Sequence, residues 1–268
     1  MASVEANGRR IYFDDTGGDL PALVLLQGFM ASRGVWKWQI EAFSPHFRVV
    51  TMDNRDAGES DPETDAYSMA DLAGDVASLL DALGIEKASL IGHSMGGYVA
   101  LQFAASYPER LDKLVLVGTS ALAGGALGRP APGYDRSRFI EDPVERTRSR
   151  YGRLTAPGYF DSHPEQLEAL AESAHGNRLT FEAMVRQSDS AFMTHDTRAA
   201  LPKITAPVLV IHGDLDQTIP ITAGRKIAEA IPGARMVEYE GVGHLPHIER
   251  VEEFNREVLA FLMGDGEA

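Results

Sequence analysis

The sequence predicts an α/β protein with a mostly parallel, doubly wound sheet and an inserted helical segment. Three observations support this fold class: apolar runs of strand length recur along the chain, amphipathic segments separate them, and the alternation breaks between about residues 121 and 202. Continuous apolar runs, unlike alternating ones, indicate strands that are covered on both faces, as in a parallel sheet. Strands that alternate with helices indicate repeated right-handed βαβ units.

The strands are predicted from these runs in chain order. Residues 3–14 form a predicted hairpin, because Asn7-Gly8 is a strong type I′ turn signal. A weak run at 235–239 predicts the last strand. The stronger runs, which predict buried strands, are 22–27, 47–52, 88–91, 114–117 and 208–212.

The helices between the runs are predicted from their apolar faces. Over 72–83, apolar residues follow the spacing i, i+4, i+7, i+8, i+11, which is one face of a helix. Ser68 and Asp71 resemble a capping box at its start, and Gly84 lies where a helix-ending glycine belongs. Further helices are predicted over 95–106, 223–230 and 252–263.

Residues 121–202 interrupt this alternation and are predicted to form a helical insertion. The segment contains no apolar strand run, is rich in arginine and has several Gly and Pro residues between short helical pieces. The alternation then resumes, which indicates an insertion into one core made of residues 1–120 and 203–268. We expect the arginines to pair with the acids of the same segment on a solvated face.

Composition excludes several classes of protein. The 268 residues include 25 Lys and Arg against 39 Asp and Glu, so the net charge is −14 and nucleic-acid binding is not expected. Cysteine is absent, which excludes disulfides, a cysteine nucleophile and thiolate metal sites. The longest apolar stretches have about six residues, against roughly 20 for a membrane helix. No signal peptide is visible, so a cytoplasmic location is predicted.

Residues 92–96 carry the strongest candidate for chemistry. They read Gly92-His93-Ser94-Met95-Gly96, a G-x-S-x-G pattern between a predicted strand and a predicted helix. A serine on such a sharp turn is held with its Oγ exposed, and Gly92 and Gly96 let the turn close without Cβ clashes. The following helix directs free N–H groups at developing negative charge. We interpret Ser94 as a nucleophile; the alternative is a glycine-rich packing turn.

A serine hydroxyl needs a base, and the base needs an acid that orients it. His244 is the candidate base, because it lies in a glycine-containing loop between the last predicted strand and the last helix. The acid should follow another strand. The run 208–212 is followed by two carboxylates, Asp214 and Asp216, whereas the preceding run is followed by none. Elimination therefore gives the chain order Ser94, Asp, His244 but leaves the choice between the two acids open.

At these residues the chain resembles the α/β-hydrolase superfamily with a helical cap, over roughly residues 20–120 and 203–262. The resemblance implies that the insertion at 121–202 is the cap, or lid. The sequence HGDLDQTIP at 212–220 is similar to the family segment HGxxDxxxP, in which the second acid is catalytic. The resemblance therefore implies that Asp216 orients the histidine. Asp214 is then a loop-shaping or helix-capping residue.

Two further segments carry the resemblance, one with a departure. Gly243-His244 matches the catalytic histidine loop of the family. DNRDAGES at 53–60 is similar to the segment DxRGxGxS, but Asp56 replaces the first glycine. Because that segment is mainly structural in the family, we expect the departure to leave activity intact.

The resemblance also implies an oxyanion hole made of two backbone N–H groups, those of Phe29 and Met95. Family members usually carry His-Gly before the first of these donors, whereas this chain has Gln27-Gly28. Backbone donors do not depend on the side chain, so the hole can survive the change. Gln27 either holds the loop as the histidine would, or reaches the substrate.

The resemblance implies a serine hydrolase that cleaves a carboxylic ester or lactone through an acyl-enzyme, similar to small esterases, enol-lactonases and cofactor-free perhydrolases. It implies no organic cofactor and no metal, and His244 with His247 lacks a third ligand at metal spacing. One alternative uses the same triad on a C–C bond of a diketone ring-cleavage product. The other is a ligand receptor with little turnover. The natural substrate, the cap residues around it and the oligomeric state stay open.

Overall fold

The computed structural model describes residues 2–122, 140–173 and 180–264, without the side chains of 191–193. In this part of the chain the strands form one eight-stranded sheet, in the order β1-β2-β4-β3-β5-β6-β7-β8. The strands are β1 (Ala2–Ala6), β2 (Arg9–Asp15), β3 (Ala22–Leu26), β4 (Arg48–Met52), β5 (Ala88–His93), β6 (Leu111–Val117), β7 (Val208–Gly213) and β8 (Arg235–Tyr239). From β4 to β8 every pair of neighbours is parallel, which confirms the predicted fold class.

The predicted hairpin supplies the antiparallel edge of this sheet. β1 pairs with β2 and β2 with β4, both antiparallel. Asn7 and Gly8 have φ values of 50° and 74°, as a type I′ turn requires. The parallel strands all run in the same direction. The residues that follow them therefore gather at one edge of the sheet, the one formed by the carboxyl ends of the strands.

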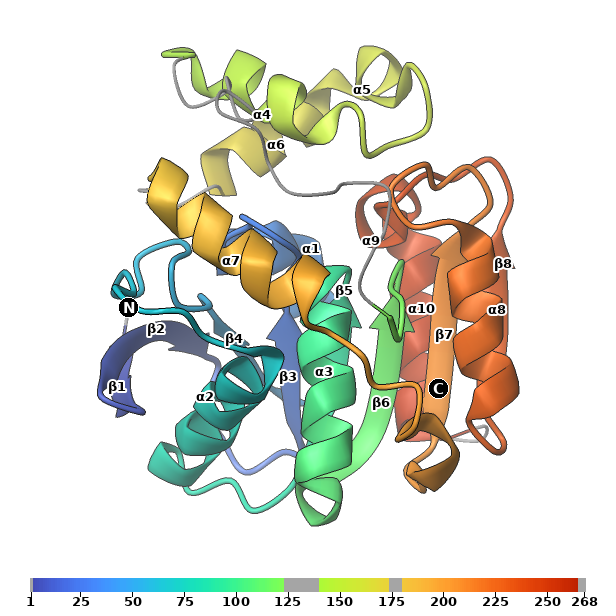
Figure 1. The fold of residues 1–268 in the computed structure, drawn as a ribbon. Helices are drawn as coiled ribbons and strands as arrows, with labels where there is room; N and C mark the ends of the chain where they lie inside the picture. Colours follow the sequence, from blue (N-terminus) through green and yellow to red (C-terminus); the bar gives the residue numbers. More distant parts are fainter. Residues whose placement is uncertain (1, 123–139, 174–179, 265–268) are drawn as a thin grey trace.

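Helices cover both faces of the sheet (Figure 1). On one face lie α2 (Met69–Ala82), α3 (Met95–Ser106) and α8 (Ile221–Ala230); on the other lie α1 (Lys37–Phe43) and α10 (Val251–Met263). Short helices connect them: η1 (Arg33–Trp36), η2 (Pro108–Arg110), η4 (Leu201–Lys203) and α9 (Pro246–Glu249). The predicted capping box at Ser68 and Asp71 is present.

Between β6 and β7, the described residues form several helices in addition to η4. They are α4 (Pro143–Tyr151), α5 (Tyr159–Ser162), α6 (Pro164–Ser173) and α7 (Phe181–Met193). Figure 1 shows α4, α5 and α6 beyond the carboxyl ends of the parallel strands, with α7 between them and the sheet. These inserted helices therefore lie over the edge at which the candidate residues gather.

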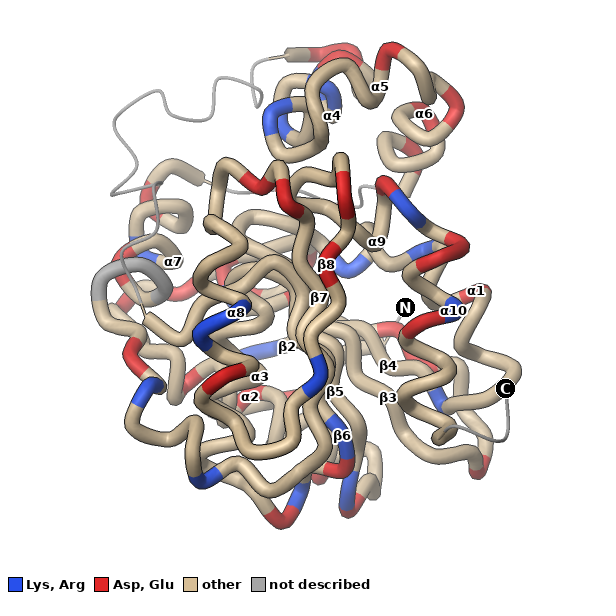
Figure 2. The backbone as a smooth tube through the Cα atoms, turned by 90° about the vertical axis from the view of Figure 1, so that its right-hand side faces the viewer, with Lys and Arg blue, Asp and Glu red and all other residues tan. Residues whose placement is uncertain are grey.

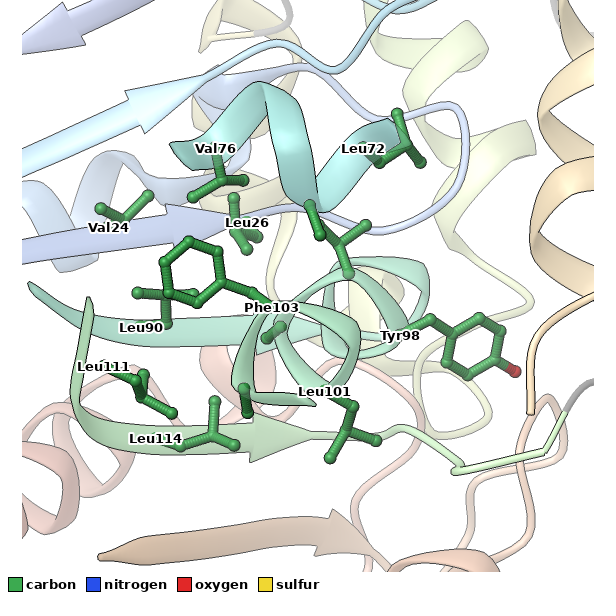
Figure 3. Close-up of a cluster of buried hydrophobic side chains, with 14 of the residues drawn as sticks. Val24, Leu26, Leu72, Val76, Leu90, Tyr98, Leu101, Phe103, Leu111 and Leu114 are labelled. Atoms are coloured by element: carbon green, nitrogen blue, oxygen red, sulfur yellow. The ribbon is translucent and has the colours of Figure 1, made fainter. Parts of the chain in front are cut away.

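The apolar runs form a buried layer on each side of the sheet. In the layer of Figure 3, Val24, Leu26 and Leu90 from the sheet pack against Val76 of α2 and Phe103 of α3. All five side chains are fully buried. Burial of a side chain of this size contributes roughly 1.5–3 kcal/mol, so this layer holds β3, β5 and α3 in fixed positions.

Some element boundaries differ from the predictions. β5 runs on to His93, two residues past the apolar run, and α2 begins at Met69, directly after its cap. The short helix α9 was not predicted. It starts at Pro246, which suits the first turn of a helix because proline has no N–H to leave unpaired.

Charged residues of both signs are spread over the elements (Figure 2). One group is internal: the buried guanidinium of Arg33 bonds the carboxylates of Asp14, Asp53 and Glu59. This group fixes the loop after β4 against η1. In the described residues, no helix is long and apolar enough to cross a membrane.

Candidate active site

Ser94 occupies the junction between β5 and α3 in a strained conformation. Its φ is 53° and its ψ −119°, a combination that L-residues rarely adopt. Its N–H donates to the carbonyl of Val117 at 2.9 Å, and its own carbonyl accepts from Thr119 Oγ1 at 2.8 Å. These bonds to the end of β6 hold the strained turn in place.

A side chain at Gly92 or Gly96 would overlap nearby backbone atoms. A Cβ at Gly92 would overlap the carbonyl of Gly96, and a Cβ at Gly96 would overlap the carbonyl of Leu26. The strand-to-helix turn can therefore close only if both positions lack a side chain. Met95 is the first residue of α3, so its N–H has no partner within the helix.

Asp216 and His244 form a buried pair. His244 Nδ1 lies 2.7 Å from Asp216 Oδ2, and both side chains are at most 2% exposed. The Asp216 oxygen can only accept, so the imidazole proton lies on Nδ1 and Nε2 keeps its lone pair. The pair therefore has the tautomer that a general base requires.

Asp216 is held as a carboxylate despite its burial. Burial raises the pKa of Asp216, but the charge of His244 and several hydrogen bonds lower it by more than burial raises it. The net pKa therefore lies below the ordinary value. The hydrogen bonds come from His212 Nε2 at 3.2 Å and from the backbone N–H groups of Thr218 and Ile219 at 2.8 and 2.9 Å. Sequence analysis did not predict the contribution of His212.

Asp214 has different surroundings. Its side chain is exposed, and Oδ1 accepts from the N–H of Gly241 at 2.7 Å, across from β7 to the loop after β8. It makes no hydrogen bond to His244 in the described part of the chain. Its contact is that of a loop-shaping residue, whereas Asp216 meets the histidine.

Ser94 and His244 both lie against the end of β6. Ser94 bonds Val117, while a Cβ at Gly118 would lie 3.2 Å from His244 Nδ1. The ring of His93 lies 4.8 Å from that of His244, measured between centroids, and its Nε2 bonds the His244 carbonyl. No hydrogen bond joins Ser94 Oγ to His244 among the described residues; such bonds often tighten only when substrate binds.

The loop after β3 lies against Ser94. A Cβ at Gly28 would be 3.2 Å from Ser94 Cβ, so the loop and the serine are in close approach. Ala31 N–H donates to the Gly28 carbonyl at 3.2 Å and closes a tight turn that contains Phe29. Gln27 is fully buried, and its amide has no hydrogen-bond partner among the described residues. Both interpretations of Gln27 therefore stay predictions.

A buried carboxylate, which sequence reasoning missed, holds the histidine loop. Glu249 accepts hydrogen bonds from Gly243 and Leu245, the two neighbours of His244, and from Ala156 of the inserted segment. Burial raises its pKa although these donors oppose the rise. A glutamate in the otherwise apolar stretch after His244 was the one available signal.

His247 packs as a neutral core residue. Its ring lies 4.6 Å from those of Trp36 and His93, and burial together with the charge of His244 lowers its pKa to about 3. Among the described residues, no group of three or more His, Asp and Glu could hold a metal ion.

This burial predicts a pH dependence of stability. The folded protein keeps His247 neutral down to about pH 3, whereas an unfolded histidine binds a proton below about pH 6.5. The contribution of His247 to the free energy of unfolding should thus be fully present above about pH 6.5. As the pH falls below this value, this contribution should decrease by about 1.4 kcal/mol per pH unit. Between pH 7 and pH 5, the free energy of unfolding measured in urea should decrease by roughly 2 kcal/mol less in His247→Phe than in the wild type. The same substitution at exposed His46 should leave the pH dependence of the free energy of unfolding as in the wild type. An equal pH dependence in all three proteins would contradict the prediction.

The fold and site define an α/β protein whose serine turn and acid–histidine pair lie at the carboxyl edge of a parallel sheet. The family model described as alpha/beta hydrolase fold matches residues 21–251. The chain therefore belongs to the α/β-hydrolase-fold family.

Two relatives from bacteria match nearly the whole chain. A 2-hydroxy-6-oxononadienedioate/2-hydroxy-6-oxononatrienedioate hydrolase of Burkholderia vietnamiensis is 33% identical, over 94% of this chain and 91% of that protein. A putative carbamate hydrolase RutD of a Caulobacter species is 30% identical, over 95% and 96%. The names of these relatives agree on hydrolysis but differ in the substrate.

Solved structures are similar along the whole chain as well. The enol-lactonase from Burkholderia xenovorans has a TM-score of 0.84 at 29% identity and covers 98% of this chain and 100% of its own. A thermophilic esterase from Thermogutta terrifontis has a TM-score of 0.81 at 29% identity, over 98% and 97%. The resemblance to small esterases and enol-lactonases predicted from the sequence is confirmed.

Proposed function

We propose that the protein is a serine hydrolase that cleaves a carboxylic ester or lactone through an acyl-enzyme. The observation that carries the proposal is the buried bond from His244 Nδ1 to Asp216, next to a strained serine. Ser94 Oγ bonds to the carbonyl carbon while its proton passes to His244 Nε2. The C–O bond then breaks and the alcohol leaves with that proton; water repeats the two steps and frees the acid.

The oxyanion is stabilised by the N–H groups of Phe29 and Met95. The close approach of Gly28 to Ser94 supports the first donor, and the start of α3 supports the second. Each donor of this kind contributes roughly 3 kcal/mol to transition-state binding. Gly92 and Gly96 allow the turn that aims the serine at this position.

The inserted segment acts as a cap over the site. Its backbone at Leu154 accepts from the N–H of His244 at 2.6 Å, and Ala156 shares the carboxylate of Glu249 with the histidine loop. A Cβ at Gly243 would meet Leu154 and Thr155 backbone atoms at 2.6 Å. The division into a core of residues 1–120 and 203–268 and a cap of 121–202 is part of this proposal, as is a cytoplasmic location.

Hydrolysis of a C–C bond in a diketone is the second candidate function. A relative at 33% identity that is named for 2-hydroxy-6-oxononadienedioate favours it. The arginines near the loops after β3 and β4 favour the ester or lactone instead. Arg33, Arg55 and Arg186 each bond at least one carboxylate, so none of the three offers an uncompensated charge to a dicarboxylate substrate.

The proposal is tested by covalent labelling and turnover with the same preparation. A fluorophosphonate should label Ser94 stoichiometrically, and p-nitrophenyl acetate should be hydrolysed with a burst of p-nitrophenol equal to the enzyme concentration. A panel of acyl esters, lactones and vinylogous diketones should give the highest kcat/KM for an ester or lactone. Preference for the diketones would replace the first candidate by the second. The absence of both labelling and turnover would indicate a ligand receptor.

A further inference from the structure

One side chain of α7 reaches the turn beside Ser94. Gln187 is fully buried, and its Oε1 accepts a hydrogen bond from the N–H of Met30 at 2.7 Å. Its Nε2 lies 3.5 Å from the carbonyl of Arg55. A single amide from the inserted segment therefore joins the loop after β3 to the loop after β4.

The turn that Gln187 contacts is strained. Ala31 N–H bonds the Gly28 carbonyl, so residues 28–31 form the turn and Met30 is its third residue. Met30 has a φ of 60°, in the left-handed region. Turns with this geometry at the third position normally use Gly or Asn, because a larger side chain is unfavourable there. The strained residue is the one whose N–H the Gln187 amide holds.

We propose that Gln187 is a positioning residue for the oxyanion hole. Its Oε1 accepts from the peptide N–H between Phe29 and Met30, so α7 stabilises the strained form of the turn. Relaxation of Met30 to a negative φ would move Phe29, and a displacement of about 1 Å is enough to weaken a catalytic donor considerably. The inference rests on the proposed function, in which the Phe29 N–H binds the oxyanion.

Other residues of α7 provide the anchoring of the helix itself. Arg186 makes two hydrogen bonds to the Asp56 carboxylate, at 2.7 and 3.0 Å, and Ser190 Oγ donates to the Tyr67 carbonyl at 2.6 Å. Both contacts are to the segment after β4 and neither is to the turn. Anchoring and positioning can therefore be separated by substitution.

The test compares variants that differ in the acceptor atom. Gln187→Met keeps the length of the side chain but removes the carbonyl, and Gln187→Asn shortens the side chain. Either variant should lower kcat for p-nitrophenyl acetate about 10- to 50-fold, with KM within twofold of the wild-type value. Ser190→Ala loosens an anchor only and should stay within threefold of wild type. Thermal unfolding checks that each variant is folded.

Glycine at position 30 provides a rescue. Because glycine adopts a positive φ without strain, Met30→Gly in the Gln187→Met background should recover at least half of the lost activity on a logarithmic scale. The rate of fluorophosphonate labelling of Ser94 should fall and recover in parallel, since the phosphoryl oxygen occupies the same hole.

The inference is overturned by a folded Gln187→Met variant with wild-type kcat and labelling rate. It is also overturned if Ser190→Ala loses as much as Gln187→Met. These outcomes leave the proposed function intact, because wild-type protein would still be labelled at Ser94. Failure of the wild type to be labelled would instead refute the proposed function.

Discussion

Ser94→Ala is expected to lower kcat for p-nitrophenyl acetate by about 10⁶-fold, the order of loss seen when the nucleophile of a serine triad is removed. Alanine keeps the Cβ of serine, so the strain at φ 53° is the same in both proteins and the change removes only the hydroxyl. The protein should stay folded, with an unchanged unfolding midpoint and no fluorophosphonate adduct.

Ser106→Ala is the matched control for this variant. Ser106 ends α3, the helix that Ser94 precedes, and its exposed hydroxyl accepts from Gln102 Nε2 at 2.9 Å. Its kcat should be that of the wild type. A purified Ser94→Ala protein that keeps more than one per cent of the wild-type kcat would show that another group attacks the carbonyl.

The sheet could be predicted because its signal is local. Each buried strand, such as β3 or β7, is a short run of large apolar residues, and burial on both faces leaves no alternative to a central position. The ends were less accurate: polar His93 belongs to β5 because its ring is packed between those of His244 and His247. That packing comes from residues about 150 positions away.

The candidate site was predictable where the residues that shape a turn lie next to one another in the sequence. Gly92 and Gly96 flank Ser94 because the turn admits no Cβ, which is visible in five consecutive residues. The approach of Asp216 to His244 needed the family pattern, since two acids follow β7 and composition does not distinguish them.

The supporting contacts could not be predicted, because each depends on a distant partner. Gln187 and Met30 are 157 positions apart, and Glu249 contacts Ala156 across 93. Arg186 was expected to pair within its own segment, but it pairs with Asp56 of the core. Asp56 is also the residue that departs from the family glycine, so the departure and the docking of α7 are linked.

Asp216→Asn should lower kcat by about 10⁴-fold, while Asp214→Asn should lose no more than tenfold. At position 216, one side-chain oxygen accepts from the N–H groups of Thr218 and Ile219, and the other accepts from His244 Nδ1. An asparagine keeps its carbonyl toward the two N–H groups, so its NH₂ faces Nδ1. The imidazole must then accept at Nδ1 and carry its proton on Nε2, where it can no longer take the proton of Ser94.

At position 214 the same substitution preserves the essential contact. The exposed Asp214 accepts from one backbone N–H, that of Gly241, and an asparagine carbonyl can accept the same bond. Both variants should be assayed on p-nitrophenyl acetate, with circular dichroism and the unfolding midpoint as controls for folding. A dead Asp214→Asn beside an active Asp216→Asn would reverse the assignment of the acid. Two active variants would mean that His244 is oriented by another group, and the triad would then have to be abandoned.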